Sequence, residues 1–227
     1  MEWHAVGSAT GVYVLEYQAA GYARANCTAI QMGDGFVILS PASNISESHI
    51  QFIEKMGPIL ALLSPHSGHT LGINGWLKLR PYLKVFAAPK ATDRISKVCK
   101  VDVRPIEELN IKDPNVKITL APGMGDTTLF IEITRGDRPV VYVDELLEDL
   151  DRYPGPAFIR PLMHLMGKKP GFQVNRGFIR FYVKNVQALA AEVLRLVNTG
   201  AHVIFAHGPV RSSPEDIAQA KALLESI

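Results

Sequence analysis

The fold is most clearly indicated by one stretch of the sequence, Ile59-Leu60-Ala61-Leu62-Leu63-Ser64-Pro65-His66-Ser67-Gly68-His69. Its first five residues are apolar and uncharged, which predicts a buried strand, and the Ser-Pro pair after them ends it. The loop that follows carries two histidines, His66 and His69. Imidazoles three positions apart in a turn can converge on one metal ion. The stretch therefore predicts a strand that delivers two ligand-type side chains at its carboxyl end.

Two other apolar strands end in the same way. Residues 140–143 run into Asp144, and residues 203–206 run into His207. The carboxyl ends of neighbouring strands in α/β proteins form one rim, where ligand sites usually lie. Taken singly, a histidine after a strand is more often a hydrogen-bonding or capping residue, and an aspartate there is more often a helix N-cap. Their shared placement favours a common site of His66, His69, Asp144 and His207.

The rest of the chain predicts a mixed α/β (α+β) layered fold. Before residue 40, short alternating runs separated by turn residues indicate antiparallel strands, and after it strands and helices alternate. We expect strands at 11–17, 27–32, 36–40, 58–63, 83–87, 116–120, 127–133, 140–143 and 202–206. We expect helices at 46–57, 71–79, from 91, at 183–197 and from 213.

Residues 152–172 differ from the rest because they hold four prolines around an apolar stretch. We interpret them as an insertion or lid with one helix. Core packing is the favoured role of its apolar side chains, with a pocket lid or a homodimer contact as alternatives. These side chains are Phe158, Ile159, Leu162, Leu165 and Met166. The nearby basic cluster is either a solvated face or a surface for an anionic substrate or acidic partner. It comprises Lys168, Lys169, Arg176, Arg180 and Lys184.

Length and composition fit one globular domain over residues 1–227. The chain is 47% hydrophobic, enough to bury a sizeable core, and its net charge of +2 argues against a nucleic-acid partner. The two cysteines, Cys27 and Cys99, match no metal or disulfide spacing and are expected to be buried thiols. With no signal-peptide pattern and no apolar run of about 18 residues, we expect a cytoplasmic protein without membrane contact that acts on a small molecule.

At these residues the chain resembles the metallo-β-lactamase fold superfamily. The loop of that superfamily reads His-x-His-x-Asp-His after a strand, and single His, Asp and His ligands follow. Here Ser64 replaces the first histidine, Gly68 replaces the aspartate, and Met124 stands where the middle Pro-Gly-His-Thr motif has its histidine. Asp144 matches the bridging aspartate, and His207 with the glycine after it matches the terminal His-Gly.

The resemblance extends over nearly the whole chain. It implies a four-layer αββα sandwich of metallo-β-lactamase type, with the metal site at one edge between the two sheets. Members mostly hydrolyse esters, phosphodiesters, thioesters or lactams. A closer likeness is to an uncharacterised branch in which the loop is also eroded and a tryptophan follows in the next helix, here Trp76. That branch carries no function to transfer.

The substitutions leave one metal site rather than two. His69, Asp144 and His207 form a set of two histidines and one carboxylate, which suits a single Zn, Mn or Fe ion with open positions for water. Glycine at position 68 can neither bind a metal nor orient water. Asp126 is interpreted as a turn residue rather than a replacement carboxylate, and Met124 as an apolar filler.

Two functions follow from this pattern. The first is a metal-dependent hydrolase in which His66, His69, Asp144 and His207 surround the metal, with Asp144 and His66 in catalytic roles. A metal-bound water would attack an ester-like or phosphoester substrate. The alternative is a non-catalytic, degenerate member of the fold that has lost its metal and serves as a binding or assembly module. The substitutions at positions 64, 68 and 124 favour the alternative, and the four retained residues favour the enzyme.

Overall fold

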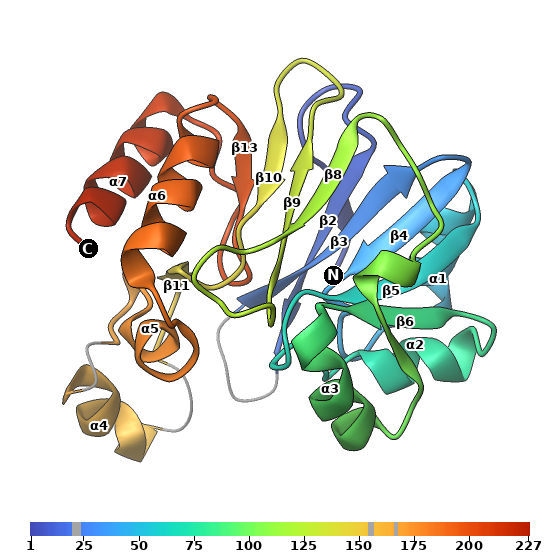
Figure 1. The fold of residues 1–227 in the computed structure, drawn as a ribbon, viewed down its shortest axis with the longest axis horizontal. Helices are drawn as coiled ribbons and strands as arrows, with labels where there is room; N and C mark the ends of the chain where they lie inside the picture. Colours follow the sequence, from blue (N-terminus) through green and yellow to red (C-terminus); the bar gives the residue numbers. More distant parts are fainter. Residues whose placement is uncertain (20–23, 154–156, 166–167) are drawn as a thin grey trace.

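Two β-sheets face each other at the centre of the structure (Figure 1). The computed structural model describes residues 1–19, 24–153, 157–165 and 168–227. Within them, seven strands form the larger sheet in chain order, antiparallel from β1 to β4 and parallel from β4 to β7. These strands are β1 (Trp3–Ala5), β2 (Val12–Gln18), β3 (Arg24–Met32), β4 (Gly35–Leu39), β5 (Ile59–Ser64), β6 (Lys84–Ala87) and β7 (Val103–Pro105).

The smaller sheet has the order β13-β10-β9-β8 in the described residues. β10 and β13 run parallel, so the residues that follow both strands emerge at the same edge. The strands are β8 (Val116–Leu120), β9 (Leu129–Ile133), β10 (Val140–Tyr142) and β13 (His202–Ile204). A separate antiparallel pair, β11 (Leu147–Leu150) and β12 (Gly171–Val174), follows β10 in the chain.

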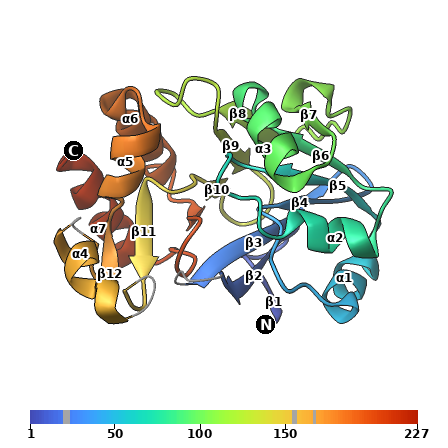
Figure 2. The same ribbon diagram turned by 90° about the horizontal axis from the view of Figure 1, so that it is seen from below.

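Helices cover the outer face of each sheet, as Figures 1 and 2 show. The larger sheet carries α1 (Glu47–Glu54), α2 (Ile73–Leu79) and α3 (Thr92–Cys99), and the smaller carries α6 (Val186–Val197) and α7 (Pro214–Glu225). The shorter helices are η1 (Pro89–Ala91), η2 (Ile106–Glu108), η3 (Ala157–Ile159), α4 (Arg160–Leu165) and α5 (Arg176–Tyr182). In the described parts of the chain, no helix is long and apolar enough to cross a membrane. The layers are helix, sheet, sheet, helix, which confirms the expected αββα sandwich.

The smaller sheet is buried on both faces because its side chains alternate between two apolar clusters. Ile131 and Tyr142 pack into the cluster shared with the larger sheet. Their neighbours Phe130 and Val141 point the other way and pack against α6 and α7. Alternation with a period of two places successive side chains on opposite faces. A strand buried in this way reads as a continuous apolar run, which is how residues 140–143 appear in the sequence.

Helix boundaries follow local capping signals. Ser46 precedes α1 and forms a capping box with His49, whose ring lies 3.2 Å from the Ser46 backbone nitrogen. Ser213 accepts a hydrogen bond of 3.1 Å from the backbone of Asp216 at the start of α7, where proline occupies the first helical position. All the expected strands and both of these helix starts are present, with ends shifted by one or two residues in most cases.

The expectation of one helix over residues 183–197 is wrong at its start. Residues 183–185 break the helical path, and Asn185 caps α6 by accepting a hydrogen bond of 3.0 Å from the backbone of Ala188. The preceding residues form α5, capped by Asn175. An asparagine N-cap therefore starts each helix. The apolar periodicity continues through residues 183–185, so it does not reveal the break between the two helices.

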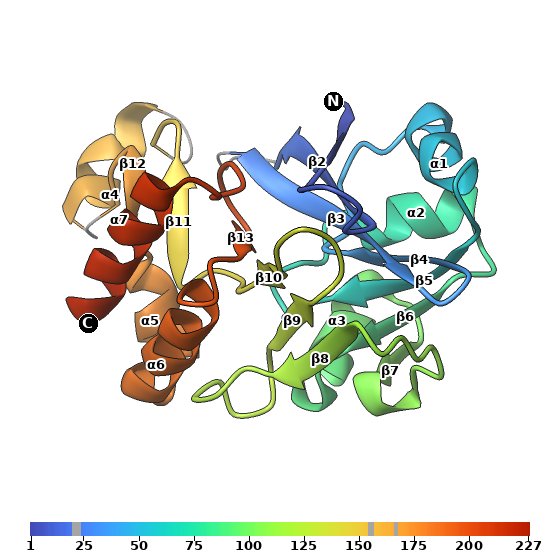
Figure 3. The ribbon, with the colours of Figure 1, turned by 90° about the horizontal axis from the view of Figure 1, so that it is seen from above.

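The expected core packing of the apolar stretch in 152–172 is also wrong. Phe158, Leu162 and Leu165 are 82%, 54% and 84% exposed. They lie on η3 and α4, in the excursion between β11 and β12, and Figure 3 shows α4 beside β12 at one end of the molecule. Both elements lie away from the two sheets, so these three side chains have no core to enter. Met166 and the side chain of Ile159 fall outside the described residues.

Candidate metal centre

The loop after β5 is folded so that its two histidines point the same way. The hydroxyl of Ser64 donates to the backbone carbonyls of His66 and His69, at 3.0 and 2.9 Å. The two imidazole centroids lie 4.6 Å apart. Ser64 itself is fully buried and does not face the site. The serine that replaces a histidine in the family motif thus holds the loop that carries the other two.

Asp144 follows β10 and projects toward these histidines from the opposite sheet. Its backbone is left-handed, with φ of 55°, and its carbonyl accepts a bond of 3.0 Å from the backbone of Ala206. Tyr142 donates to its Oδ1 at 3.0 Å. Its Oδ2 is buried and has no hydrogen-bond partner among the described residues. A buried carboxylate oxygen without a donor is costly unless a cation neutralises it.

His207 follows β13 and completes the ring of imidazoles. Its Nδ1 donates to the backbone carbonyl of Arg24 at 3.1 Å, so the lone pair of the neutral ring lies on Nε2, which faces the site. Asn26 of β3 fixes the turn around His207 by donating from its side-chain amide to the carbonyls of Phe205 and Gly208, at 2.8 and 2.7 Å. The larger sheet therefore positions a histidine that the smaller sheet supplies.

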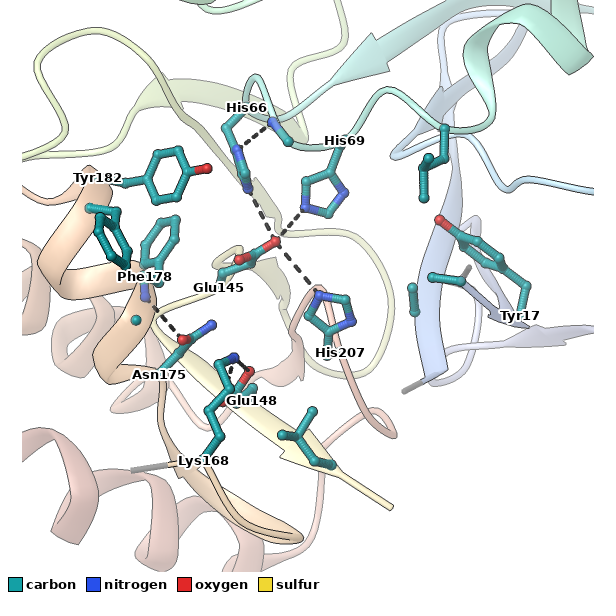
Figure 4. Close-up of a pocket in the computed structure, with 17 residues that line it drawn as sticks. Tyr17, His66, His69, Glu145, Glu148, Lys168, Asn175, Phe178, Tyr182 and His207 are labelled. Atoms are coloured by element: carbon teal, nitrogen blue, oxygen red, sulfur yellow. Dashed lines mark hydrogen bonds and ion pairs between the residues drawn. The ribbon is translucent and has the colours of Figure 1, made fainter. Parts of the chain in front are cut away.

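Glu145 lies at the centre of the site, and no sequence pattern above points to it. Its Oε1 is 3.2 Å from Nε2 of both His66 and His69 and 3.6 Å from Nε2 of His207 (Figure 4). The one signal in the sequence is its position directly after Asp144. Neighbouring residues on an extended strand point to opposite faces, but the left-handed turn at Asp144 allows both carboxylates to enter one site.

The structure brings the predicted residues together. His66, His69 and Asp144 each place one candidate ligand atom within 4.8 Å of the others. The separations from Nε2 to the aspartate oxygens are 3.6 Å for His66 and 3.4 Å for His69. His207 reaches the same group through Glu145. Three of the four residues that the sequence singles out therefore form one group, and His207 contacts Glu145 beside it.

Charge coupling in the site is strong. Burial alone would lower the pKa of His66, but the carboxylates of Asp144 and Glu145 outweigh it and raise that pKa to about 9. Burial also acts to lower the pKa of His207, while the hydrogen bond and charge of Glu145 raise it above its usual value. Burial raises the pKa of Asp144. Burial acts to raise that of Glu145 too, but the histidines hold it well below its usual range.

The donor set fits a single divalent ion. Ligands about 2.0 to 2.1 Å from a tetrahedral ion lie about 3.3 to 3.4 Å from one another. The separation between Nε2 of His69 and Oδ1 of Asp144, 3.4 Å, matches that value. The unpartnered Oδ2 of Asp144 is a second sign that a cation belongs here. Nitrogen and carboxylate ligands suit Zn, Mn and Fe(II).

His66 differs from the other two imidazoles. Its Nδ1 accepts a hydrogen bond of 2.8 Å from the backbone of Gly68, so the neutral ring carries its proton on Nε2. In this orientation Nε2 of His66 donates to Oε1 of Glu145 at 3.2 Å and has no lone pair for a metal. His69 pairs through Nδ1 with the hydroxyl of Ser40 at 2.5 Å, which can accept the ring proton and leave Nε2 free. The set of His69, Asp144 and His207, assisted by His66, is consistent with these tautomers.

Gly68, Met124 and Asp126 contribute no ligand to the site. A Cβ on Gly68 would lie 2.4 Å from Cε1 of His66, so the ring occupies the space that a side chain would need. Met124 is buried in the apolar cluster beneath α6 and α7, as expected of a filler. Asp126 is a turn residue with φ of 65° and pairs with Lys90 at 2.8 Å on the surface. The lost ligands are not replaced from these positions.

A cavity of about 280 Å³ opens in front of the site. One wall is aromatic: Phe178 and Tyr182 of α5 stack with centroids 5.6 Å apart, and each lies 5.7 Å from the ring of His66. At the other end, Lys168 pairs with the buried Glu148 at 2.9 Å (Figure 4). Of the basic cluster noted in the sequence, Lys168 is the member that lines the cavity among the described residues.

Comparison with known proteins links this arrangement to a fold. No family model and no curated protein matches the sequence. The solved structure of the DIM-1 metallo-β-lactamase is 14% identical, has a TM-score of 0.65, and the match covers 100% of this chain and 98% of that one. A metallo-β-lactamase from Pontibacter korlensis is 12% identical, with a TM-score of 0.63 and coverage of 100% and 99%.

A third structure shows how widely the architecture is shared. The Flv1 flavodiiron core from Synechocystis sp. PCC6803 is 12% identical with a TM-score of 0.58, and the match covers 99% of this chain and 61% of that one. Identities this low establish architecture and leave chemistry open. With its two facing sheets, its outer helices and full-length structural matches, the chain has the metallo-β-lactamase fold.

Proposed function

We infer that this protein is a metal-dependent hydrolase with one divalent ion held by His69, Asp144 and His207. The observation that carries this proposal is that His66, His69 and Asp144 each place one ligand-type atom within 4.8 Å of the others, around a buried carboxylate whose Oδ2 has no hydrogen bond from the described residues. When bound, such an ion lowers the pKa of a water molecule and polarises a carbonyl or phosphoryl oxygen. The site faces a cavity, so a substrate can reach it.

The chain's own residues supply a hydrogen-bond donor and the orientation. His66 lines the cavity, and its ring carries a proton on Nε2 because Nδ1 accepts from the backbone of Gly68. This N–H group can donate a hydrogen bond to a substrate oxygen. The stacked rings of Phe178 and Tyr182 offer a flat apolar wall that orients a substrate and excludes water from one side.

The charges of the cavity favour a neutral ester over a phosphoester. Lys168 is the lysine that lines the described cavity wall, and Glu148 neutralises it. An anionic phosphodiester would therefore find this ammonium group already paired. A carboxylic ester with an aromatic or alkyl group matches the lining better.

One observation favours the non-catalytic alternative. Oε1 of Glu145 contacts the Nε2 atoms of three imidazoles, at 3.2 to 3.6 Å. A carboxylate and histidine cluster of this kind can hold the two sheets together by itself. On that view the cavity would bind a partner or ligand without turning it over, and the protein would serve as a binding or assembly module.

Metal content separates the two functions. Tag-free protein purified without chelator is analysed by plasma mass spectrometry beside a His69→Ala, His207→Ala double variant. A His4→Ala, His164→Ala variant is the matched control, since both histidines are exposed and outside the site. The hydrolase predicts about one equivalent of Zn, Mn or Fe in the wild type and the control, and none in the site variant. No metal in any of them, even after reconstitution, rejects the hydrolase.

The activity test follows the same design. The metal-loaded wild type is assayed on aryl and alkyl carboxylic esters and on aryl phosphodiesters. We expect turnover of the neutral esters that is lost in the double variant. Turnover of phosphodiesters alone would refute the substrate preference and keep the metal site.

A further inference from the structure

We propose that the end of the molecule that carries α4 and α5 docks on an anionic lipid membrane. The docking face consists of Phe158, Leu162 and Leu165, which form an exposed apolar stripe, and of the exposed cations in the chain around them. This proposal goes beyond the hydrolase, since docking requires neither a metal nor catalysis. It replaces the expectation, drawn from the sequence alone, of a protein without membrane contact.

The apolar stripe runs along η3 and α4 and has no cover from the described residues. Phe158, Leu162 and Leu165 follow one another at intervals of four and three, which places them on one face of a helix. Each is more than half exposed, and no described side chain of the two helices is buried. A helical segment this short is marginal in water, because helices in proteins are stabilised mainly by packing of an apolar face. An apolar face without a partner among the described residues is typical of a contact surface.

The chain around this stripe carries cations and no acidic residue. Residues 152–184 contain seven Lys and Arg and no Asp or Glu. Lys168 is neutralised by Glu148, and the other six are exposed and form no ion pair within the described residues. These six are Arg152, Arg160, Lys169, Arg176, Arg180 and Lys184. Clustered cations of this kind attract the anionic headgroups of a membrane.

α5 joins the docking face to the mouth of the cavity. Figures 1, 2 and 3 show α4 and α5 at the same end of the molecule. Arg176 and Arg180 lie one helical turn apart on the exposed side of α5. Phe181 of the same helix lines the cavity and is 67% exposed, and Leu71 lines it from the loop before α2 and is 55% exposed. The mouth of the cavity is therefore apolar and lies beside cations of the docking face.

Charge and size favour a membrane over a protein partner. A second copy of the chain would bring the same cations to this face, and the like charges would repel each other across a two-fold contact. Three apolar side chains are also too few for a stable protein interface, which usually buries about 1,200 to 2,000 Å². A membrane surface, in contrast, accepts a few apolar side chains at its headgroup boundary and binds cations that are spread over a face.

Vesicle flotation of the full chain in EDTA tests docking without any metal. Vesicles of phosphatidylcholine alone are compared with vesicles of phosphatidylcholine and phosphatidylglycerol. The wild type should bind the anionic vesicles more tightly, and added salt should weaken this binding. A Phe158→Ser, Leu165→Ser variant should bind them more than about tenfold more weakly, because it has less apolar area to bury. The matched control is Met56→Ser, Tyr82→Ser, whose side chains are exposed beyond the ends of α1 and α2, and it should bind as the wild type does.

The cations are tested in the same assay with an Arg176→Gln, Arg180→Gln variant. Each cation near an anionic membrane contributes about fivefold to binding, so this variant should bind the anionic vesicles about 25-fold more weakly. Its control is Lys55→Gln, Lys100→Gln, which removes two exposed charges elsewhere and should have no effect. Thermal unfolding checks that every variant folds, and all the replaced side chains are exposed. If the serine variant does not fold, the arginine variant decides.

Three results would overturn the proposal. The first is a wild type that binds neither kind of vesicle or binds both equally. The second is full binding by the folded Phe158→Ser, Leu165→Ser or Arg176→Gln, Arg180→Gln variant. The third is a wild-type dimer in gel filtration that becomes a monomer in the serine variant, because a second copy of the chain would then cover the stripe.

One consequence for the substrate rests on the proposed hydrolase. A docked protein brings its apolar cavity mouth to the esters of the membrane, so the substrate class is an acyl ester held in that membrane. The metal-loaded Phe158→Ser, Leu165→Ser variant should keep the wild-type rate on a soluble aryl ester and lose turnover of an acyl ester in anionic vesicles. If the wild type turns over neither ester but still binds the vesicles, the hydrolase is rejected and the docking face stands.

Discussion

Asn26 links the two sheets at the point where His207 is held, and replacing it gives a sharp test of how the site is built. The residue is fully buried on β3. Its side-chain amide donates to the carbonyls of Phe205 and Gly208, at 2.8 and 2.7 Å, and its backbone donates to Ala206 at 2.9 Å. Asn26→Ala removes the first two bonds and leaves the third.

The loss can be estimated from these contacts. A buried carbonyl that loses its donor costs about 1 to 3 kcal/mol. Two such carbonyls predict that Asn26→Ala lowers the free energy of unfolding by about 2 to 6 kcal/mol. This is a large share of the roughly 5 to 15 kcal/mol of a typical domain. Asn26→Asp keeps the shape but sets a carboxylate oxygen against the two carbonyls. It should therefore cost more than alanine, because acceptors then face each other in a buried place.

Urea unfolding in EDTA measures this loss without interference from metal. Asn198→Ala is the control, since Asn198 is exposed after α6 and should change stability by less than about 0.5 kcal/mol. A Zn²⁺ titration of the folded Asn26→Ala protein should also show weaker binding, because the turn that carries His207 is no longer fixed. A loss of stability below about 1 kcal/mol, or an Asn26→Asp protein as stable as the wild type, would refute the reasoning.

Three further predictions concern the residues around the site. Tyr142→Phe removes the hydroxyl that donates to Asp144. It should weaken Zn²⁺ binding by about 10- to 100-fold in a calorimetric titration. Unchanged affinity would mean that the phenol does not orient this carboxylate. Ser64→Ala removes the hydroxyl that donates to the carbonyls of the histidine loop. It should lower the free energy of unfolding, measured in urea, by about 1 to 3 kcal/mol. An unchanged free energy of unfolding would show that the loop keeps its conformation without this hydroxyl. In EDTA, the pKa of His66 in the folded protein is raised to about 9. The stability that its proton contributes is therefore complete below pH 6.5 and is lost as the pH rises to 9. The urea midpoint of the wild type should fall over that range, and that of His66→Gln should fall less. Equal dependence of the two midpoints on pH would contradict the charge coupling between His66 and its carboxylates.

The sequence predicts the layered fold and the four retained site residues because both depend on local patterns. Apolar runs that end in His66, Asp144 and His207 are visible without any tertiary knowledge, and the parallel pairing of β10 and β13 brings two of these ends together. The hairpins near the amino terminus and the proline start of α7 are also local signals. The structure confirms the layered fold and these strands, whereas the roles of the site residues stay a prediction.

The parts that the sequence does not predict depend on partners far along the chain. β11 and β12 pair across the excursion that holds α4, and the acidic residue Glu148 in β11 is buried only because Lys168 meets it. Read alone, Leu-Glu-Asp-Leu over residues 147–150 looks like an exposed turn. The central place of Glu145 depends in the same way on a left-handed turn at Asp144, which no composition rule requires.

The close contact between Gly68 and the ring of His66 makes a side chain at position 68 hard to introduce. The Cβ of an aspartate there would lie too close to Cε1 of His66, and the ring is held in place by the backbone of Gly68 itself. The two positions are therefore coupled: Gly68→Asp is disfavoured until His66 rotates, and rotation of His66 breaks its hydrogen bond with the backbone of residue 68. An engineer who wishes to add a carboxylate at this position must change the loop as a unit rather than one residue at a time.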